Sequence, residues 1–180
     1  MEFTNVTSIF SPQSTIPLFA DIVKNPRGLI YGFNASKFGA VASRKHLSEI
    51  QEAKELGAKA IVTLKVESEG GKLLLKGGGS VSEKMTETER EALINALHAQ
   101  AGDLLVLSAG TVWDETLNSL GRARLNTAQL MQQKELLVIN PNQYNFMWVI
   151  DFPLFECSSE GQGGLFDNKS REEGIASMHH

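Results

Sequence analysis

The histidines and the single cysteine are the residue types that could form a metal site or supply a nucleophile. His179 and His180 are adjacent, and neighbouring residues of an extended chain point in opposite directions, so both imidazoles reach one metal ion only across a bend. His46 and His98 lie in expected helices without an acidic or cysteine partner at ligand spacing. Cys157 follows a glutamate, whereas a reactive thiolate needs a positive neighbourhood. The spacing therefore predicts neither a metal site nor a cysteine nucleophile.

Two other segments could bind an anion. The glycine-rich run at residues 76–80 could present backbone N–H groups to a phosphate. It lacks the Gly-Lys-Ser/Thr ending of a P-loop and the spacing of a dinucleotide fingerprint, so an ordinary loop is the main expectation. Arg122, Arg124 and Lys134 could form a basic edge on one predicted helix, with a solvated helix face as the alternative.

One acidic residue stands at the end of an apolar segment. Residues 146–152 alternate as a strand with apolar side chains on both sides, and Asp151 lies near its end. A carboxylate among such neighbours needs hydrogen-bond partners. Asp151 is therefore either a structural anchor or a site residue.

Composition restricts the classes of protein to consider. The 180 residues are 42% hydrophobic and 21% charged, with one cysteine, which is typical of a globular chain and excludes an internal disulfide. Seventeen lysines and arginines against 21 acidic residues give a net charge of −4, so any grip on nucleic acid must be local. The sequence contains no apolar run of membrane-spanning length and no secretion signal.

The elements that would position these residues follow from periodicity and from capping signals. Ser43 and Gly57 bound one expected helix, and Thr86 with Glu89 forms a capping box that starts another, which Gly102 ends. Expected strands cover residues 29–33, 59–67, 73–75, 104–107 and 146–152, and a third helix covers residues 113–131. Because two glycines turn residues 59–75 into a hairpin, we predict an α+β fold with an antiparallel or mixed sheet and about three helices on one face.

Several motifs carry a resemblance to a known family. The segment FMWVIDFPLFE at residues 146–156, followed by a variable loop and the terminal His179 and His180, resembles the bacterial-type aspartyl-tRNA synthetases of bacteria and mitochondria. Upstream, AGDLL at residues 101–105 and LGRARL at residues 120–125 resemble the GAD insertion domain of that family. The resemblance implies an insertion domain at residues 1–140. Residues 141–180 would then be a strand and loop returning to an incomplete class II catalytic domain.

The resemblance also implies a function. Such an enzyme activates aspartate with ATP and Mg²⁺ and transfers it to tRNA, and its paired histidines approach the bound aspartate. Carried over, His179 and His180 would recognise aspartate in the full enzyme, while Arg122, Arg124 and Lys134 would at most contact tRNA weakly. We expect the isolated piece to be inactive, and the full enzyme to be a homodimer in the bacterial cytoplasm or, alternatively, the mitochondrial matrix.

Two other interpretations remain open. The chain could be a tRNA-positioning GAD module of a tRNA-dependent amidotransferase subunit, or a free-standing α+β adaptor with an unknown partner. The segment at residues 148–156 and the histidine pair favour the synthetase, because the amidotransferase needs neither.

Overall fold

The computed structural model describes residues 1–144, 146–148, 155–158 and 174–177. The chain divides into two compact units, Met1–Ile139 and Asn140–His180, and each is described by itself. Among the described helices, none combines the length and the apolar character needed to cross a membrane.

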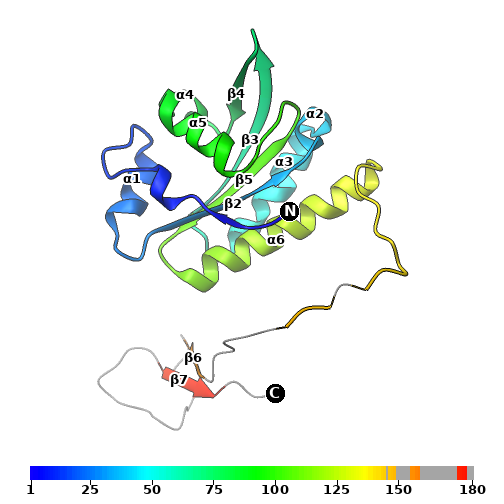
Figure 1. Cartoon of the computed structure of the whole chain (residues 1–180). Helices are drawn as coiled ribbons and strands as arrows, with labels where there is room; N and C mark the ends of the chain where they lie inside the picture. The colour runs from blue at the N-terminus through cyan, green and yellow to red at the C-terminus, as the bar shows by residue number, and fades with distance from the viewer. Residues whose placement is uncertain (145, 149–154, 159–173, 178–180) are drawn as a thin grey trace. The chain divides into compact units, whose positions relative to one another are not determined.

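The first unit is built on a five-stranded antiparallel sheet with the strand order β1-β2-β5-β3-β4 (Figure 1). Its central strand β5 is buried at every position, because it is paired on both sides and covered on both faces. The strands are β1 Thr4–Asn5, β2 Leu29–Ala35, β3 Ala60–Glu69, β4 Lys72–Gly77 and β5 Leu104–Gly110.

Helices cover both faces of this sheet. One face carries α1 Pro17–Lys24, η1 Thr7–Ile9, α4 Ser80–Lys84 and α5 Glu87–Ala96. The other carries α2 Phe38–Val41, α3 Arg44–Gln51, η2 Glu52–Leu56 and the long α6 Trp113–Gln133 (Figure 1). The predicted α+β class and antiparallel pairing are confirmed, but the expectation of about three helices on one face is wrong.

The apolar run in β5 explains why two layers of helices are needed. Leu105 and Leu107 enter one hydrophobic cluster, while Leu104 and Val106 enter the cluster on the opposite face. The same is true of β3, where Val62 and Leu64 enter the first cluster and Ile61 enters the second, on the face that also carries Thr63. Thr63 is only 2% exposed and its hydroxyl accepts a hydrogen bond from Gln51 of α3. Strands that are apolar on both faces require cover on both.

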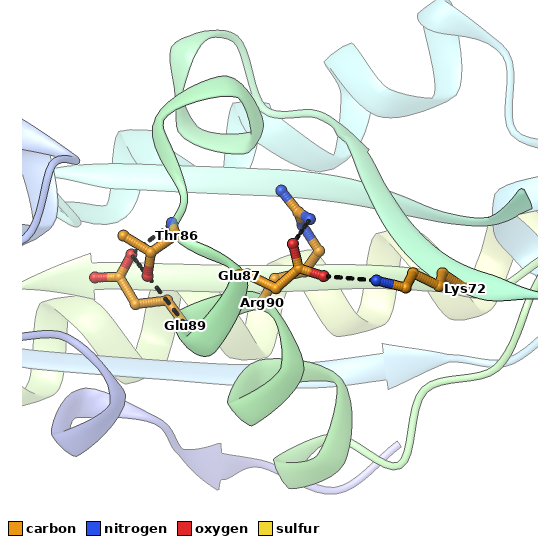
Figure 2. A network of polar contacts seen from close by, with 5 residues as sticks. All are labelled: Lys72, Thr86, Glu87, Glu89 and Arg90. Atoms are coloured by element: carbon orange, nitrogen blue, oxygen red, sulfur yellow. Dashed lines mark hydrogen bonds and ion pairs between the residues drawn. The ribbon is translucent and has the colours of Figure 1, made fainter.

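The capping signals in the sequence place two helix starts correctly. Ser43 accepts from the backbone N–H of His46, and the His46 ring accepts in return from the Ser43 N–H, which caps α3. Thr86 and Glu89 make the equivalent reciprocal bonds at α5 (Figure 2). The expected end of this second helix at Gly102 is wrong, because α5 stops at Ala96 and the chain turns before β5.

The second unit contains a small antiparallel pair, β6 Phe155–Ser158 with β7 Gly174–Ser177. Phe146, Met147 and Trp148 are exposed and belong to no strand. The predicted strand at residues 146–152 is therefore wrong for these three positions. Asp151, with the rest of that segment, lies outside the described residues.

Candidate functional site

The residues predicted to form a site are not gathered at one place. His179 and His180 lie outside the described residues. Arg122 and Arg124 are exposed on α6, and Lys134 is the residue that ends this helix. At about 100° per residue, two positions on a helix separated by two are about 200° apart. Arg122 and Arg124 therefore point to opposite sides of α6 and do not form one basic cluster.

Arg124 is positioned by aromatic residues. Its guanidinium carbon Cζ lies 4.5 Å from the centroid of the Phe3 ring, a cation–π contact. Phe3 in turn stacks on Phe33 of β2, with ring centroids 6.2 Å apart. Since Phe33 is fully buried in the core, the sheet fixes the ring that holds the arginine.

A second aromatic pair lies at the beginning of the same helix. Tyr31 of β2 meets Trp113 of α6 edge to face, with centroids 5.6 Å apart and ring planes at 80°. Trp113 remains 55% exposed, so much of the indole is open to solvent. We call Phe3, Tyr31, Trp113 and Arg124 together the α6 aromatic surface.

The electrostatics of α6 differ from those of the chain as a whole. Between Thr116 and Gln133, Arg122 and Arg124 are the only charged residues. Within the part of the chain that the structure describes, neither arginine forms an ion pair with a carboxylate. Arg122 points to the other side of α6, and Asp114 and Glu115 stand in the first turn of this helix. Arg124 is therefore the one cation of the α6 aromatic surface, which can receive a planar group on its rings and an anion at this guanidinium.

Sequence reasoning identified Arg124 but missed its aromatic neighbours. Phe3 precedes a strand of two residues, too short to show any alternation. Tyr31 appeared only as a strand residue and Trp113 only as a helix start. The contacts join residues far apart in the sequence, so no local pattern could have indicated them.

The AGDLL motif contains Asp103, which is the centre of a buried hydrogen-bond network. Asp103 is only 4% exposed. Its carboxylate accepts hydrogen bonds from the Asn34 amide at 2.8 Å, the Lys37 backbone N–H at 2.8 Å and the Gln100 backbone N–H at 2.9 Å. This one side chain thus ties β2, the segment leading into α2 and the turn before β5 together.

Close backbone packing surrounds this hydrogen-bond network. The Ala40 N–H donates to the Gly102 carbonyl at 2.9 Å. A Cβ atom at Gly39 would overlap the carbonyl oxygen of Asp103. The glycine is required here because the backbone of α2 lies directly against the start of β5.

The remaining sequence candidates also have structural roles. Gly77, Gly78 and Gly79 all have positive φ, and a Cβ at Gly78 would lie 2.8 Å from side-chain atoms of Val62 and Leu64, so backbone conformation and packing account for the glycine run without a phosphate. His46 caps α3 and stacks on Phe38. His98 is exposed and lines a shallow depression of about 240 Å³. The described residues contain no group of three or more His, Cys, Asp or Glu able to hold a metal ion.

Comparison with known proteins connects this fold to a family. The GAD domain model matches residues 19–120. An aspartate–tRNA(Asp/Asn) ligase of Bacillus cytotoxicus is 34% identical over 161 residues, covering 89% of this chain and 25% of the relative. One from Bacillus mycoides is 36% identical over 154 residues, covering 85% of this chain and 24% of the relative. A mitochondrial aspartate–tRNA ligase of Dictyostelium discoideum is 26% identical over 188 residues, covering 100% and 25%.

The chain thus spans about a quarter of the length of these relatives. The family model covers the sheet from β2 to β5 together with the helices from most of α1 to the first turns of α6. It includes the hydrogen-bond network of the buried Asp103 and the aromatic pair of Tyr31 and Trp113. The chain belongs to the GAD domain family.

Proposed function

We propose that this chain acts as the GAD-containing part of an aspartate–tRNA ligase. The observation that carries the proposal is the extent of similarity to relatives bearing that name. It spans 161 residues in the Bacillus cytotoxicus ligase, beyond the residues 19–120 that match the GAD model. An isolated GAD module accounts only for the shorter match.

We further propose how the parts of the chain divide. Residues 1–140 form the insertion domain, and residues 141–180 return to a class II catalytic domain. In the complete ligase, His179 and His180 contact the substrate aspartate, because an imidazole N–H donates a hydrogen bond to a carboxylate. The complete enzyme is a homodimer, located in the bacterial cytoplasm or, alternatively, the mitochondrial matrix.

ATP and Mg²⁺ supply the activating chemistry in such a ligase. The donor set in the described residues does not fit them, since no cluster of acidic or histidine side chains there could hold a metal ion, and positive φ at all three positions accounts for the glycine run at residues 77–79. We therefore assign adenylate formation to other parts of the ligase. The contribution of this chain is to bind and position.

The test is aspartate-dependent ATP–pyrophosphate exchange by the full-length ligase containing this chain. His179→Ala is expected to raise the aspartate Michaelis constant at least tenfold, about 1.4 kcal/mol of lost binding. His98→Ala is the matched control, because this exposed imidazole belongs to the first unit. It should leave the constant unchanged.

Two results contradict this proposal in different ways. An unchanged Michaelis constant for His179→Ala removes the histidine from the aspartate site. Absence of aspartate-dependent exchange in the wild-type protein refutes the ligase assignment and supports the GAD module of an amidotransferase. The 180-residue chain alone is expected to give no exchange signal.

A further inference from the structure

One face of α6 combines features that the fold itself does not require. Trp113, Leu117, Gly121 and Arg124 follow each other at spacings of three or four residues, so they lie along one side of the helix. Trp113 and Arg124 are exposed and Leu117 is partly exposed. Phe3 and Tyr31 border this face from the sheet, through their contacts with Arg124 and Trp113.

Gly121 is the least expected residue on this face. A glycine inside a helix destabilises it by roughly 0.5–1 kcal/mol relative to alanine. Apart from the adjacent residues and the backbone of its own helix, no described atom lies within 4 Å of the position that its Cβ would occupy, so packing against other elements does not demand a glycine. Gly39, by contrast, is required by the backbone of Asp103. The absence of a side chain at Gly121 leaves room for another molecule to approach the helix backbone.

The chemistry on either side of Gly121 indicates what that molecule is. The open indole of Trp113 offers a flat apolar surface, on which a nucleic-acid base can stack. Arg124 is held against Phe3, and among the described residues it has no carboxylate partner. A guanidinium in this state suits a phosphate group. Two acids, Asp114 and Glu115, stand beside Trp113 in the first turn of the helix, about nine residues from Arg124.

The length of the face suits a short strand. Trp113 and Arg124 are eleven residues apart, which is about 16 Å along a helix. A single nucleic-acid strand advances about 3.4 Å per stacked nucleotide, so the distance corresponds to about four or five nucleotides. Its backbone would cross the helix near Gly121.

We propose that the face formed by Trp113, Leu117, Gly121 and Arg124, bordered by Phe3 and Tyr31, binds a short unpaired segment of RNA. A base stacks on Trp113, the strand passes over Gly121, and the Arg124 guanidinium donates hydrogen bonds to a phosphate. RNA as the partner rests on the proposed ligase function; the exposed indole and the position of the Arg124 guanidinium rest on the structure.

The test uses the 180-residue chain with Trp148→Phe, which leaves Trp113 as its only tryptophan. An unstructured five-nucleotide RNA is titrated at low salt while Trp113 fluorescence is recorded. Saturable quenching is expected. Arg124→Ala and Gly121→Leu should each weaken binding at least fivefold, because one removes the phosphate contact and the other fills the crossing point.

Arg122→Ala is the matched control. It removes the same charge from the same helix, but from the opposite side, and it should change the affinity less than twofold. Far-UV circular dichroism of every variant verifies that the helix is intact. An equal loss in Arg122→Ala and Arg124→Ala would mean that RNA senses only net charge, which overturns the proposal.

Two further results also overturn it. The first is an absence of saturable quenching by the RNA. The second is shielding of Trp113 from acrylamide in the full-length ligase without RNA, since a protein surface would then cover this face. Pyrophosphate exchange separates this proposal from the proposed ligase function. Normal aspartate-dependent exchange without a change in Trp113 fluorescence on addition of RNA would leave the ligase assignment unchallenged and refute RNA binding at this face.

Discussion

Replacement of Asp103 by alanine tests whether its buried carboxylate holds the GAD fold together. The carboxylate accepts from Asn34, Lys37 and Gln100 at 2.8–2.9 Å and is 4% exposed. Asp103→Ala leaves all three donors without this acceptor. Two of them are backbone N–H groups, which cannot turn away without moving the segment between β2 and α2 or the turn before β5.

The magnitude follows from the donors that lose their partner. A hydrogen bond to a charged group contributes about 1.5–3 kcal/mol. The three bonds are partly buried, and the Asn34 amide also donates to the Leu97 carbonyl, so the loss is smaller than the full sum. We therefore expect Asp103→Ala to lower the free energy of unfolding by about 3–5 kcal/mol, which is a large effect for one substitution. Asp103→Asn keeps one acceptor oxygen and should retain part of this stability.

Urea unfolding followed by far-UV circular dichroism measures the effect. Asp21→Ala is the matched control, because Asp21 forms only an exposed ion pair with Lys24, a kind of contact worth at most about 1 kcal/mol. A loss below about 1 kcal/mol for Asp103→Ala, or one equal to that of Asp21→Ala, would refute the role of this carboxylate.

Three further predictions concern backbone packing, capping and pH. Gly39→Ala should destabilise the fold because its Cβ meets backbone atoms, whereas Gly121→Ala, in open space, should stabilise it by about 0.5–1 kcal/mol; an unchanged or raised urea midpoint for Gly39→Ala would contradict the first prediction, and a lowered midpoint for Gly121→Ala the second. Thr86→Ala breaks a capping box and should cost about 1 kcal/mol; a midpoint equal to that of wild type would show that the cap is dispensable. Lys76 donates a hydrogen bond to the Glu67 carboxylate of β3, which raises the pKa of this ammonium above its ordinary value of 10.5. The pair therefore stabilises the protein below pH 10.5, and this effect is lost as the pH rises through the raised pKa. The stability difference between wild type and Lys76→Met should thus stay constant from about pH 6 to 9; a difference that shrinks within that range, in urea titrations at each pH, would contradict the assignment.

The ion pairs of Glu87 on α5 illustrate which polar contacts contribute to stability. Glu87 lies 3.6 Å from Lys72 and 3.9 Å from Arg90, with exposed side chains at Lys72 and Glu87 (Figure 2). Exposed pairs of this kind contribute little to stability. Glu89, two residues further along the helix, is 8% exposed and accepts hydrogen bonds from both Thr86 and Ser14. Burial therefore separates the structural carboxylate from the solvated one.

Local sequence signals predicted the helix starts, turns and strands that depend on residues close together in the chain. The Ser43 and Thr86 capping boxes fixed two helix starts, because a cap is a bond between residues three apart. The paired glycines at 70 and 71 have positive φ and turn β3 into β4, as their freedom at positive φ predicts. The apolar run at residues 104–107 predicted the strand that begins β5. The family resemblance likewise needed only the printed residues.

Only the tertiary structure decided how these elements cover the sheet and where a surface arises. The sequence pattern did not predict α1, because a helix of eight residues is too short for an apolar repeat to stand out. The environment of Arg124 depends on Phe3, more than a hundred residues earlier, and that of Asp103 on Asn34. The sequence alone determined the local bonds and the α+β class; chain folding decided which distant side chains meet, because contacts between sheet neighbours and packed layers have no fixed spacing along the chain.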